Sequence, residues 1–139
     1  MKKIIVLLLI VLPFLVVAQE KAEDCFKRGV EFSNKGKYSE AIAEIKKALE
    51  LAPSYAEYHF NLGVVLANKK EYDEAIKEIE ISISINPDNV MTHYVLAMLY
   101  DKRKMKDKAL AEWNKVLSLN PDEELKKLAE KHIKRLKGE

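Results

Sequence analysis

The sequence predicts an all-α fold in which three similar pairs of helices follow one another and one more helix ends the chain. Glycine and proline each occur only four times in 139 residues, and the helix-favouring residues alanine, leucine, glutamate and lysine are abundant. Pro53, Pro87 and Pro121 stand 34 residues apart. Between them, apolar residues recur with the spacing of amphipathic helices. A fixed interval of this length is typical of proteins built from repeated helix pairs.

The first 18 residues, MKKIIVLLLIVLPFLVVA, differ from the rest of the chain. Two lysines precede an apolar run over residues 4–17, and Val16 and Ala18 suit a signal peptidase. We therefore expect a signal peptide over residues 1–18, cleaved after Ala18, and a mature protein that is periplasmic or secreted. The run contains Pro13 and is fourteen residues long, whereas a membrane-spanning helix needs about 20 apolar residues. An uncleaved membrane anchor is the alternative.

The repeated region, residues 19–121, divides into three units over residues 22–55, 56–89 and 90–121. The first helix of each unit is expected over residues 22–34, 55–68 and 89–102. The second helix of each unit is expected over residues 38–51, 72–85 and 105–119. The prolines lack an amide hydrogen and end each second helix, and Ser54 and Glu57 have the spacing of a capping box before the second unit.

Small residues stand at matching positions in the two helices of every unit. They are Gly29, Gly63 and Ala97 in the first helices, and Ala41, Ala75 and Ala109 in the second helices. Without bulky side chains at these positions, paired helices can approach to about 8 Å.

Residues 122–139 form one amphipathic helix that does not continue the repeat pattern. Its apolar face comprises Leu125, Leu128, Ala129, His132, Ile133 and Leu136. A stack of repeats needs a terminal element with a polar outer face to cover its last apolar surface. We therefore predict a C-terminal capping helix over residues 122–139.

At these positions the chain resembles the tetratricopeptide repeat family. The matching residues of the first helices are Cys25, Arg28, Gly29 and Phe32; His59, Leu62, Gly63 and Leu66; and His93, Leu96, Ala97 and Tyr100. Those of the second helices are Ala41, Ile45, Ala48 and Pro53; Ala75, Ile79, Ser82 and Pro87; and Ala109, Trp113, Val116 and Pro121. The resemblance implies a right-handed superhelical α-solenoid of three helix-turn-helix repeats plus a C-terminal capping helix.

The same resemblance implies that the first helices line a concave groove that holds a peptide or helix of a partner protein. The groove positions are Glu23, Phe26, Lys27, Val30 and Asn34; Glu57, Phe60, Asn61, Val64 and Asn68; and Met91, Tyr94, Val95, Met98 and Lys102. An aromatic column (Phe26, Phe60 and Tyr94), with an apolar residue one turn later, predicts an exposed apolar ladder. Packing between neighbouring first helices is the alternative role of that column. Only Asn61 matches the family's clamp for a C-terminal carboxylate, so we do not expect such a clamp.

Residues suited to catalysis or metal binding do not converge in the predicted fold. Cys25, His59 and His93 share a column, but successive units lie a whole helix pair apart and cannot bring three donors to one ion. We expect core or half-buried histidines instead. The sequence contains no phosphate-binding glycine loop and no hydrolase or metalloprotease motif. We therefore predict no enzyme activity, no metal and no cofactor.

Charge excludes nucleic acid as a partner. The chain has 24 basic and 22 acidic residues, and loss of Lys2 and Lys3 leaves 22 of each, which is too little positive charge for binding to phosphates. Basic residues do gather at the expected turns, but acidic residues lie close by, as on a solvated surface. The basic set comprises Lys35, Lys37, Lys69, Lys70, Lys102, Arg103, Lys104 and Lys106.

These observations predict an adaptor outside the cytoplasm that binds a peptide or amphipathic helix of another protein. Contact with the membrane is expected only through the signal segment. A self-assembling scaffold, in which another copy covers the groove, is one alternative. A membrane-tethered assembly factor is the other, if residues 1–18 are retained.

Overall fold

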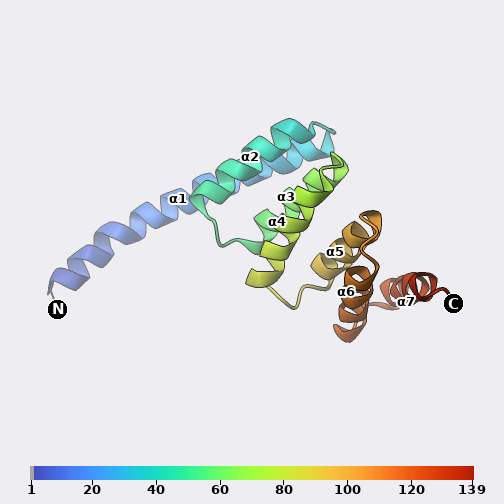
Figure 1. Cartoon of the computed structure of the whole chain (residues 1–139). Coiled ribbons are helices and arrows are strands. Elements are labelled where there is room, and N and C mark those ends of the chain that lie inside the picture. Colours follow the sequence, from blue (N-terminus) through green and yellow to red (C-terminus); the bar gives the residue numbers. More distant parts are fainter. Residues whose placement is uncertain (1) are drawn as a thin grey trace.

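The computed structural model describes the backbone of residues 2–139 and the side chains of residues 15–139. This part of the chain forms seven α-helices and no strand (Figure 1). In chain order they are α1 (Lys2–Asn34), α2 (Tyr38–Leu51), α3 (Ala56–Asn68), α4 (Tyr72–Ile85), α5 (Val90–Lys102), α6 (Lys106–Ser118) and α7 (Glu123–Lys137). The predicted all-α class is confirmed. Apart from the start of α1, the bounds of the six repeat helices lie within one residue of prediction.

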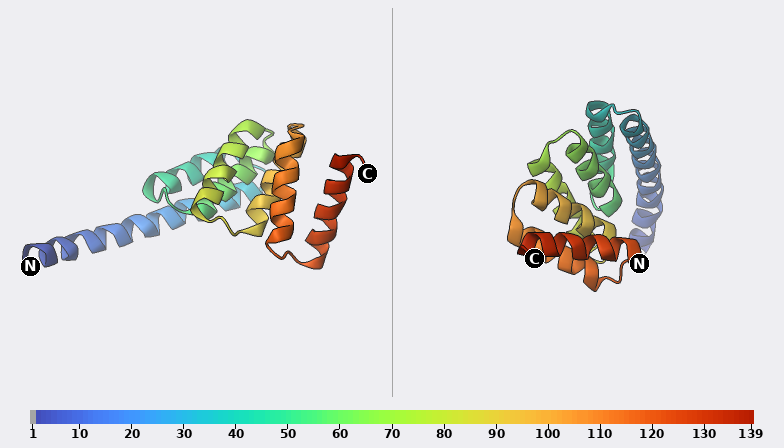
Figure 2. Two further views of the ribbon diagram at one scale, coloured as in Figure 1. Left: turned by 60° about the horizontal axis from the view of Figure 1, so that its bottom comes forward. Right: turned by 90° about the vertical axis from the view of Figure 1, so that its right-hand side faces the viewer.

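The helices pack as three hairpins that follow one another through the molecule. α1 packs on α2, α3 on α4 and α5 on α6, and α7 packs on α6 at the end of the stack (Figures 1 and 2). The first helices also contact one another, α1 with α3 and α3 with α5. This arrangement is the predicted α-solenoid, and it places the first helices in one layer.

The small residues of the repeat allow the two helices of a hairpin to pack closely. A Cβ atom added to Gly63 would lie 2.7 Å from side-chain carbons of Ile79 and 3.1 Å from the carbonyl oxygen of Ala75. A Cβ atom on Gly29 would lie 2.6 Å from Ile45. The third unit has Ala97 at this position, fully buried. The predicted role of these residues is therefore confirmed.

α1 begins far earlier than the predicted start at residue 22. The N-terminal segment and the first repeat helix form one continuous helix from Lys2 to Asn34, because no turn residue stands between Val17 and Ala22 to end it. The N-terminal half projects away from the stack (Figures 1 and 2). The side chains of residues 1–14 lie outside the described residues, so the signal peptide over residues 1–18 stays a prediction. Among the described residues, no helix combines the length and the apolar character needed to cross a membrane.

Each turn between the paired helices contains one residue in the left-handed conformation. In the first unit this residue is Gly36, with φ of 71°. In the second and third units the same position is Lys70, with φ of 69°, and Lys104, with φ of 57°. Glycine is favoured in this conformation because it has no Cβ atom. The second and third turns therefore hold a lysine where glycine fits best.

A histidine joins three segments in each of the last two units. In the second unit Nε2 of His59 donates to the carbonyl oxygen of Pro53 at 2.9 Å, and Nδ1 lies 2.7 Å from a carboxylate oxygen of Glu78. The third unit repeats this with His93, Pro87 (2.8 Å) and Glu112 (2.7 Å). Both ring nitrogens of each histidine therefore have a hydrogen-bond partner. These contacts tie the preceding loop and the second helix to the first helix.

The first unit replaces this histidine with a cysteine and an arginine. Cys25 is half-buried, and its sulfur lies 3.2 Å from a guanidinium nitrogen of Arg28. Nε of Arg28 donates to Glu44 at 2.8 Å, and Glu44 occupies the column of Glu78 and Glu112. The Cys/His/His column is thus structural, as expected. The described residues contain no cluster of three or more potential metal ligands.

The helix ends show one error of the sequence analysis. The predicted capping box of Ser54 and Glu57 does not form, because Tyr55, in an extended conformation, is the N-cap of α3 and makes no side-chain cap bond. Asn89 caps α5 by accepting from the amides of Met91 and Thr92. Asp122 caps α7 by accepting from the amide of Leu125 at 2.8 Å. Caps of this kind contribute about 1 kcal/mol each.

The last helix covers the end of the apolar core, as predicted. Ala129 and Ile133 of α7 are buried. His132 stacks on the fully buried Trp113 of α6, with ring centroids 4.6 Å apart. Arg135 forms an ion pair with Asp101 at the end of α5. These contacts identify α7 as a capping helix.

Candidate functional site

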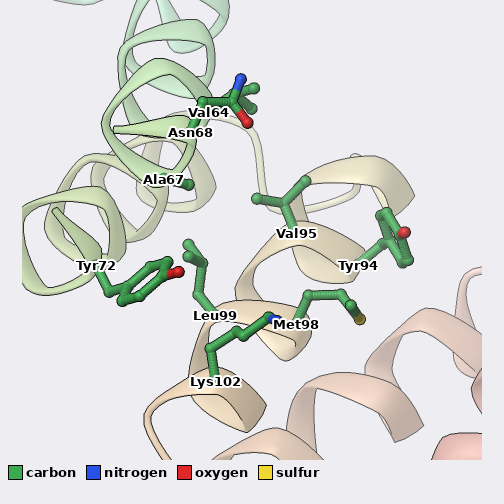
Figure 3. A pocket seen from close by; sticks show the side chains of 9 residues that line it. All are labelled: Val64, Ala67, Asn68, Tyr72, Tyr94, Val95, Met98, Leu99 and Lys102. Carbon is green, nitrogen blue, oxygen red and sulfur yellow. The ribbon is translucent and has the colours of Figure 1, made fainter. Parts of the chain in front are cut away.

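The layer of first helices carries a hollow between α3 and α5, here called the central hollow. It measures about 270 Å³ and is lined by Val64, Ala67, Asn68, Tyr72, Tyr94, Val95, Met98, Leu99 and Lys102. Figure 3 shows Tyr72 and Leu99 projecting into the space between the two helices, with Tyr72 entering from α4, whereas Tyr94 and Met98 extend from α5 away from α3. Its walls therefore belong to two successive repeats.

The central hollow is apolar, with a polar rim at one end. Val64, Val95 and Met98 are half-buried in its walls. Asn68 and Lys102, the last residues of α3 and α5, are exposed at the rim. A hollow of this size and composition can accept a large apolar side chain and place a charged or polar group of the ligand beside it.

Two further hollows lie toward the starts of α3 and α5. The first, here called the loop hollow, measures about 410 Å³ and is lined by Ala56, Glu57, Phe60, Asn61, Ser82, Asn86, Asn89 and Met91. The second, here called the cap hollow, measures about 240 Å³ and is lined by Met91, Tyr94, Asp122, Glu124, Leu125 and Leu128. Met91 lines both of these hollows and Tyr94 lines both the cap hollow and the central hollow, so the three hollows adjoin one another and are together called the groove.

All ten of the predicted groove residues of the second and third units line these hollows. They are Glu57, Phe60, Asn61, Val64, Asn68, Met91, Tyr94, Val95, Met98 and Lys102. The second and third units therefore bring their predicted residues together.

The first unit does not contribute to the groove as expected. Phe26 is only 8% exposed, because it stacks on Tyr58 with ring centroids 4.5 Å apart. Val30 is half-buried and Asn34 is exposed, but neither lines one of the three hollows. The predicted ladder of three exposed aromatic residues is thus reduced to Phe60 and Tyr94, and the packing role applies to Phe26.

Several lining residues were missed by the sequence analysis. Tyr72 comes from a second helix, and its signal was the aromatic residue repeated as Tyr38 one unit earlier. Leu125 and Leu128 were assigned to the apolar face of the capping helix, and the structure shows that they also wall the cap hollow. Tyr94 lines both the central hollow and the cap hollow, and its ring meets that of Trp113 edge-on, with ring centroids 5.8 Å apart.

Tyr58 of α3 and Tyr100 of α5 are buried and hydrogen-bonded. Burial, together with the hydrogen bond from its hydroxyl to Glu23, raises the pKa of Tyr58 to about 12. Burial and the bond to Glu80 raise the pKa of Tyr100 further. Both phenols therefore stay protonated near neutral pH and act as fixed donors. They support the helices that carry the groove.

Comparison with known proteins places the repeats in a family. A TPR repeat model matches residues 29–70, and two tetratricopeptide repeat models match residues 56–89 and 92–123. No curated protein matches the sequence.

Solved structures share the fold at low sequence identity. The TPR domain of Arabidopsis OM64 is 19% identical, with 85% of this chain and 98% of that one covered and a TM-score of 0.78. The first TPR of Spaghetti (RPAP3), bound to the HSP90 peptide SRMEEVD, is 18% identical over 86% of this chain and 93% of that one, with a TM-score of 0.79.

A third structure, the Yersinia enterocolitica type III secretion chaperone SycD with a peptide of the translocator YopD, is 15% identical. The alignment covers 83% of this chain and 91% of the SycD chain, with a TM-score of 0.77. At these identities the likeness shows a common fold. The three matched repeat models, which together span most of the chain, show that it belongs to the tetratricopeptide repeat family.

Proposed function

We propose that this chain is an adaptor outside the cytoplasm that holds a peptide or amphipathic helix of a partner protein in the groove between α3, α5 and α7. The central hollow carries the proposal. It is an open apolar space between two repeats, with half-buried Val64 and Met98 in its walls. An unfilled apolar surface of this kind on a folded protein typically marks an interaction site.

The similar folds support a binding role. The Spaghetti and SycD structures both contain a bound peptide. Tetratricopeptide repeats typically act as interaction modules rather than enzymes. The proposed activity is therefore reversible binding, without catalysis.

Site-specific photocrosslinking in the native compartment tests the groove. A photoreactive phenylalanine analogue placed at Val64 should form an adduct with a partner protein. The same analogue at Met105, an apolar residue that is 37% exposed at the start of α6 and lines none of the three hollows, is the control.

The combined change Phe60→Glu and Met98→Glu should abolish the adduct formed from position 64 while circular dichroism shows unchanged helicity. Equal adducts from both positions, or an adduct that survives the double change, would refute binding in the groove.

Self-assembly is the second candidate, and exposed apolar residues on the second helices favour it. Leu51, Ile81 and Ile85 are each at least 40% exposed. If these residues join copies of the chain, light scattering should show a mass that rises with concentration, and Ile81→Glu with Ile85→Glu should restore the monomer. A monomer at all concentrations excludes the scaffold.

The location outside the cytoplasm rests on the sequence of residues 1–18. Intact-mass measurement of the protein from its native host should show loss of these residues. If they are retained, the membrane-tethered assembly factor replaces the exported adaptor.

A further inference from the structure

The groove carries opposite charges at its two ends. Lys102 lines the central hollow at the end of α5, and it is the charged residue of that hollow. The charged residues of the loop and cap hollows are all acidic: Glu57, Asp122 and Glu124. Met91 and Lys102 are separated by 11 residues of α5, roughly 16 Å at 1.5 Å per residue. The groove thus has an acidic end and a basic end about three helical turns apart.

The basic end is larger than Lys102 alone. The neighbouring turns hold Lys70 and Lys104 in the left-handed conformation, where the first unit has Gly36. In the described part of the chain, Lys70, Lys102 and Lys104 have no carboxylate within ion-pair distance, whereas Lys69 and Arg103 beside them are paired with acidic residues. Three lysines without an ion pair therefore lie at, or within two residues of, the C-terminal ends of α3 and α5, the two helices that wall the central hollow.

The acidic end is likewise open to a ligand. Among the described ion pairs, none involves Glu57, Glu124 or Asp122. Asp122 accepts one bond from the amide of Leu125, which leaves its second oxygen for another donor. All three residues are exposed.

We propose that the partner segment is itself charge-polarised, with carboxylates at one end, large apolar side chains in the middle and lysine or arginine at the other end. This inference rests on the proposed function. The apolar residues fill the central hollow, the carboxylates face Lys70, Lys102 and Lys104, and the basic residues face Glu57, Asp122 and Glu124. A segment with two acidic or two basic ends meets like charge at one end and binds more weakly.

The site differs from a clamp for a C-terminal carboxylate. Asn61, the residue that matches such a clamp, lines the loop hollow beside Glu57, so a carboxylate there would face an acidic neighbour. Recognition at the opposite end of the groove, by Lys102, needs acidic side chains and does not need a chain terminus.

Three labelled probe peptides test the inference by fluorescence anisotropy with residues 19–139. Each has about 14 residues, enough for nearly four helical turns, with leucines on one face. The first has glutamates in its first turn and lysines in its last turn, the second has glutamates at both ends, and the third has lysines at both ends. Because a peptide can bind in either direction, the comparison depends on the charges of both ends and not on chain direction.

The bipolar probe should bind about tenfold more tightly than the other two at low salt, and the difference should shrink as salt is added. Combined Lys70→Glu, Lys102→Glu and Lys104→Glu substitutions should weaken the bipolar probe about tenfold and strengthen the lysine-ended probe. Lys77→Glu, one charge reversal of the same kind at an exposed residue of α4, should alter neither.

The outcomes separate the two proposals. Equal binding of all three probes, lost on Met98→Glu, would overturn charge polarity and leave the apolar groove standing. Absence of saturable binding by every probe, or binding unaffected by Met98→Glu, would overturn the groove and the polarity together.

Discussion

The contact between His93 and Glu112 should couple α5 to α6 strongly enough to be measured in a double-mutant cycle. The ring of His93 is 5% exposed and the carboxylate of Glu112 is 22% exposed, with 2.7 Å between Nδ1 and Oε2. The other ring nitrogen donates to Pro87 at 2.8 Å. His93→Phe keeps a ring of similar size and removes both bonds, and Glu112→Leu removes one.

The geometry sets the expected magnitude. A hydrogen bond to a charged group contributes about 1.5–3 kcal/mol and a neutral one about 0.5–1.5 kcal/mol. His93→Phe should therefore lower the free energy of unfolding by roughly 2–4 kcal/mol, and Glu112→Leu by roughly 1.5–3 kcal/mol. The double variant should lose less than the sum, because both single changes remove the same bond. The coupling energy should be roughly 1.5–3 kcal/mol.

Urea unfolding followed by circular dichroism measures these energies. At a typical slope of about 1–3 kcal/mol per molar urea, His93→Phe should lower the midpoint by roughly 1–2 M. The equivalent cycle on His59 and Glu78, which are 12% and 23% exposed, should give a smaller coupling because water reaches that pair more easily. Additivity within about 0.5 kcal/mol at His93 and Glu112 would show that the contact contributes nothing as a pair.

Three further predictions concern pH and helix capping. The pKa of Tyr58 is about 12 in the folded protein and about 10 in the unfolded chain, so the unfolded state loses its proton first as the pH rises. The free energy of unfolding should therefore fall above a pH of about 10. Tyr58→Phe, which also removes the bond to Glu23, should flatten that part of the plot of urea midpoint against pH. Hydrogen bonds from Lys47 and then from Arg28 hold the pKa of Glu44 below its ordinary value. The stability that Glu44 contributes is therefore present above a pH of about 4.5 and is lost as the pH falls through the folded pKa. Glu44→Gln should lessen the slope of the urea midpoint against pH on the acid side, and an unchanged slope would count against this pairing. Asp122→Ala should cost about 1 kcal/mol of unfolding free energy by removing the N-cap of α7, whereas Asp122→Asn should cost much less; equal losses would show that the cap is not responsible.

The fold could be predicted from the sequence because its determinants repeat. Pro53, Pro87 and Pro121 end second helices, and small residues such as Gly63 stand where paired helices meet at close range. Equivalent positions in successive units have similar neighbours, so they need residues of similar size and backbone conformation. Three occurrences of a pattern at one interval therefore identify the helices and their order.

Features that depend on the end of the stack could not be predicted in the same way. Phe26 occupies the column of Phe60 and Tyr94, but Tyr58 from the next unit covers it. A column predicts a position in the repeat and does not reveal how much of it the neighbouring unit buries. The groove is accordingly shorter than its columns suggest.

Contacts set by loop geometry were also beyond the sequence. The carbonyl oxygens of Pro53 and Pro87 accept from histidines six residues later, and this depends on the path of the loop between them. The same path makes Tyr55 the N-cap of α3, so that the spacing of Ser54 and Glu57 has no effect. The charge difference between the ends of the groove depends on which side chains line three adjacent hollows, and the sequence does not give that arrangement.

The central hollow has one wall on α3 and the other on α5, and these helices belong to hairpins that contact each other far less than the helices within one hairpin do. A ligand bound there would therefore contact both hairpins and hold them together. The bound ligand would resist bending of the stack between these hairpins. Tension applied to the two ends of the chain would separate the hairpins and release the ligand. The lifetime of such a complex would thus respond to mechanical load as well as to concentration.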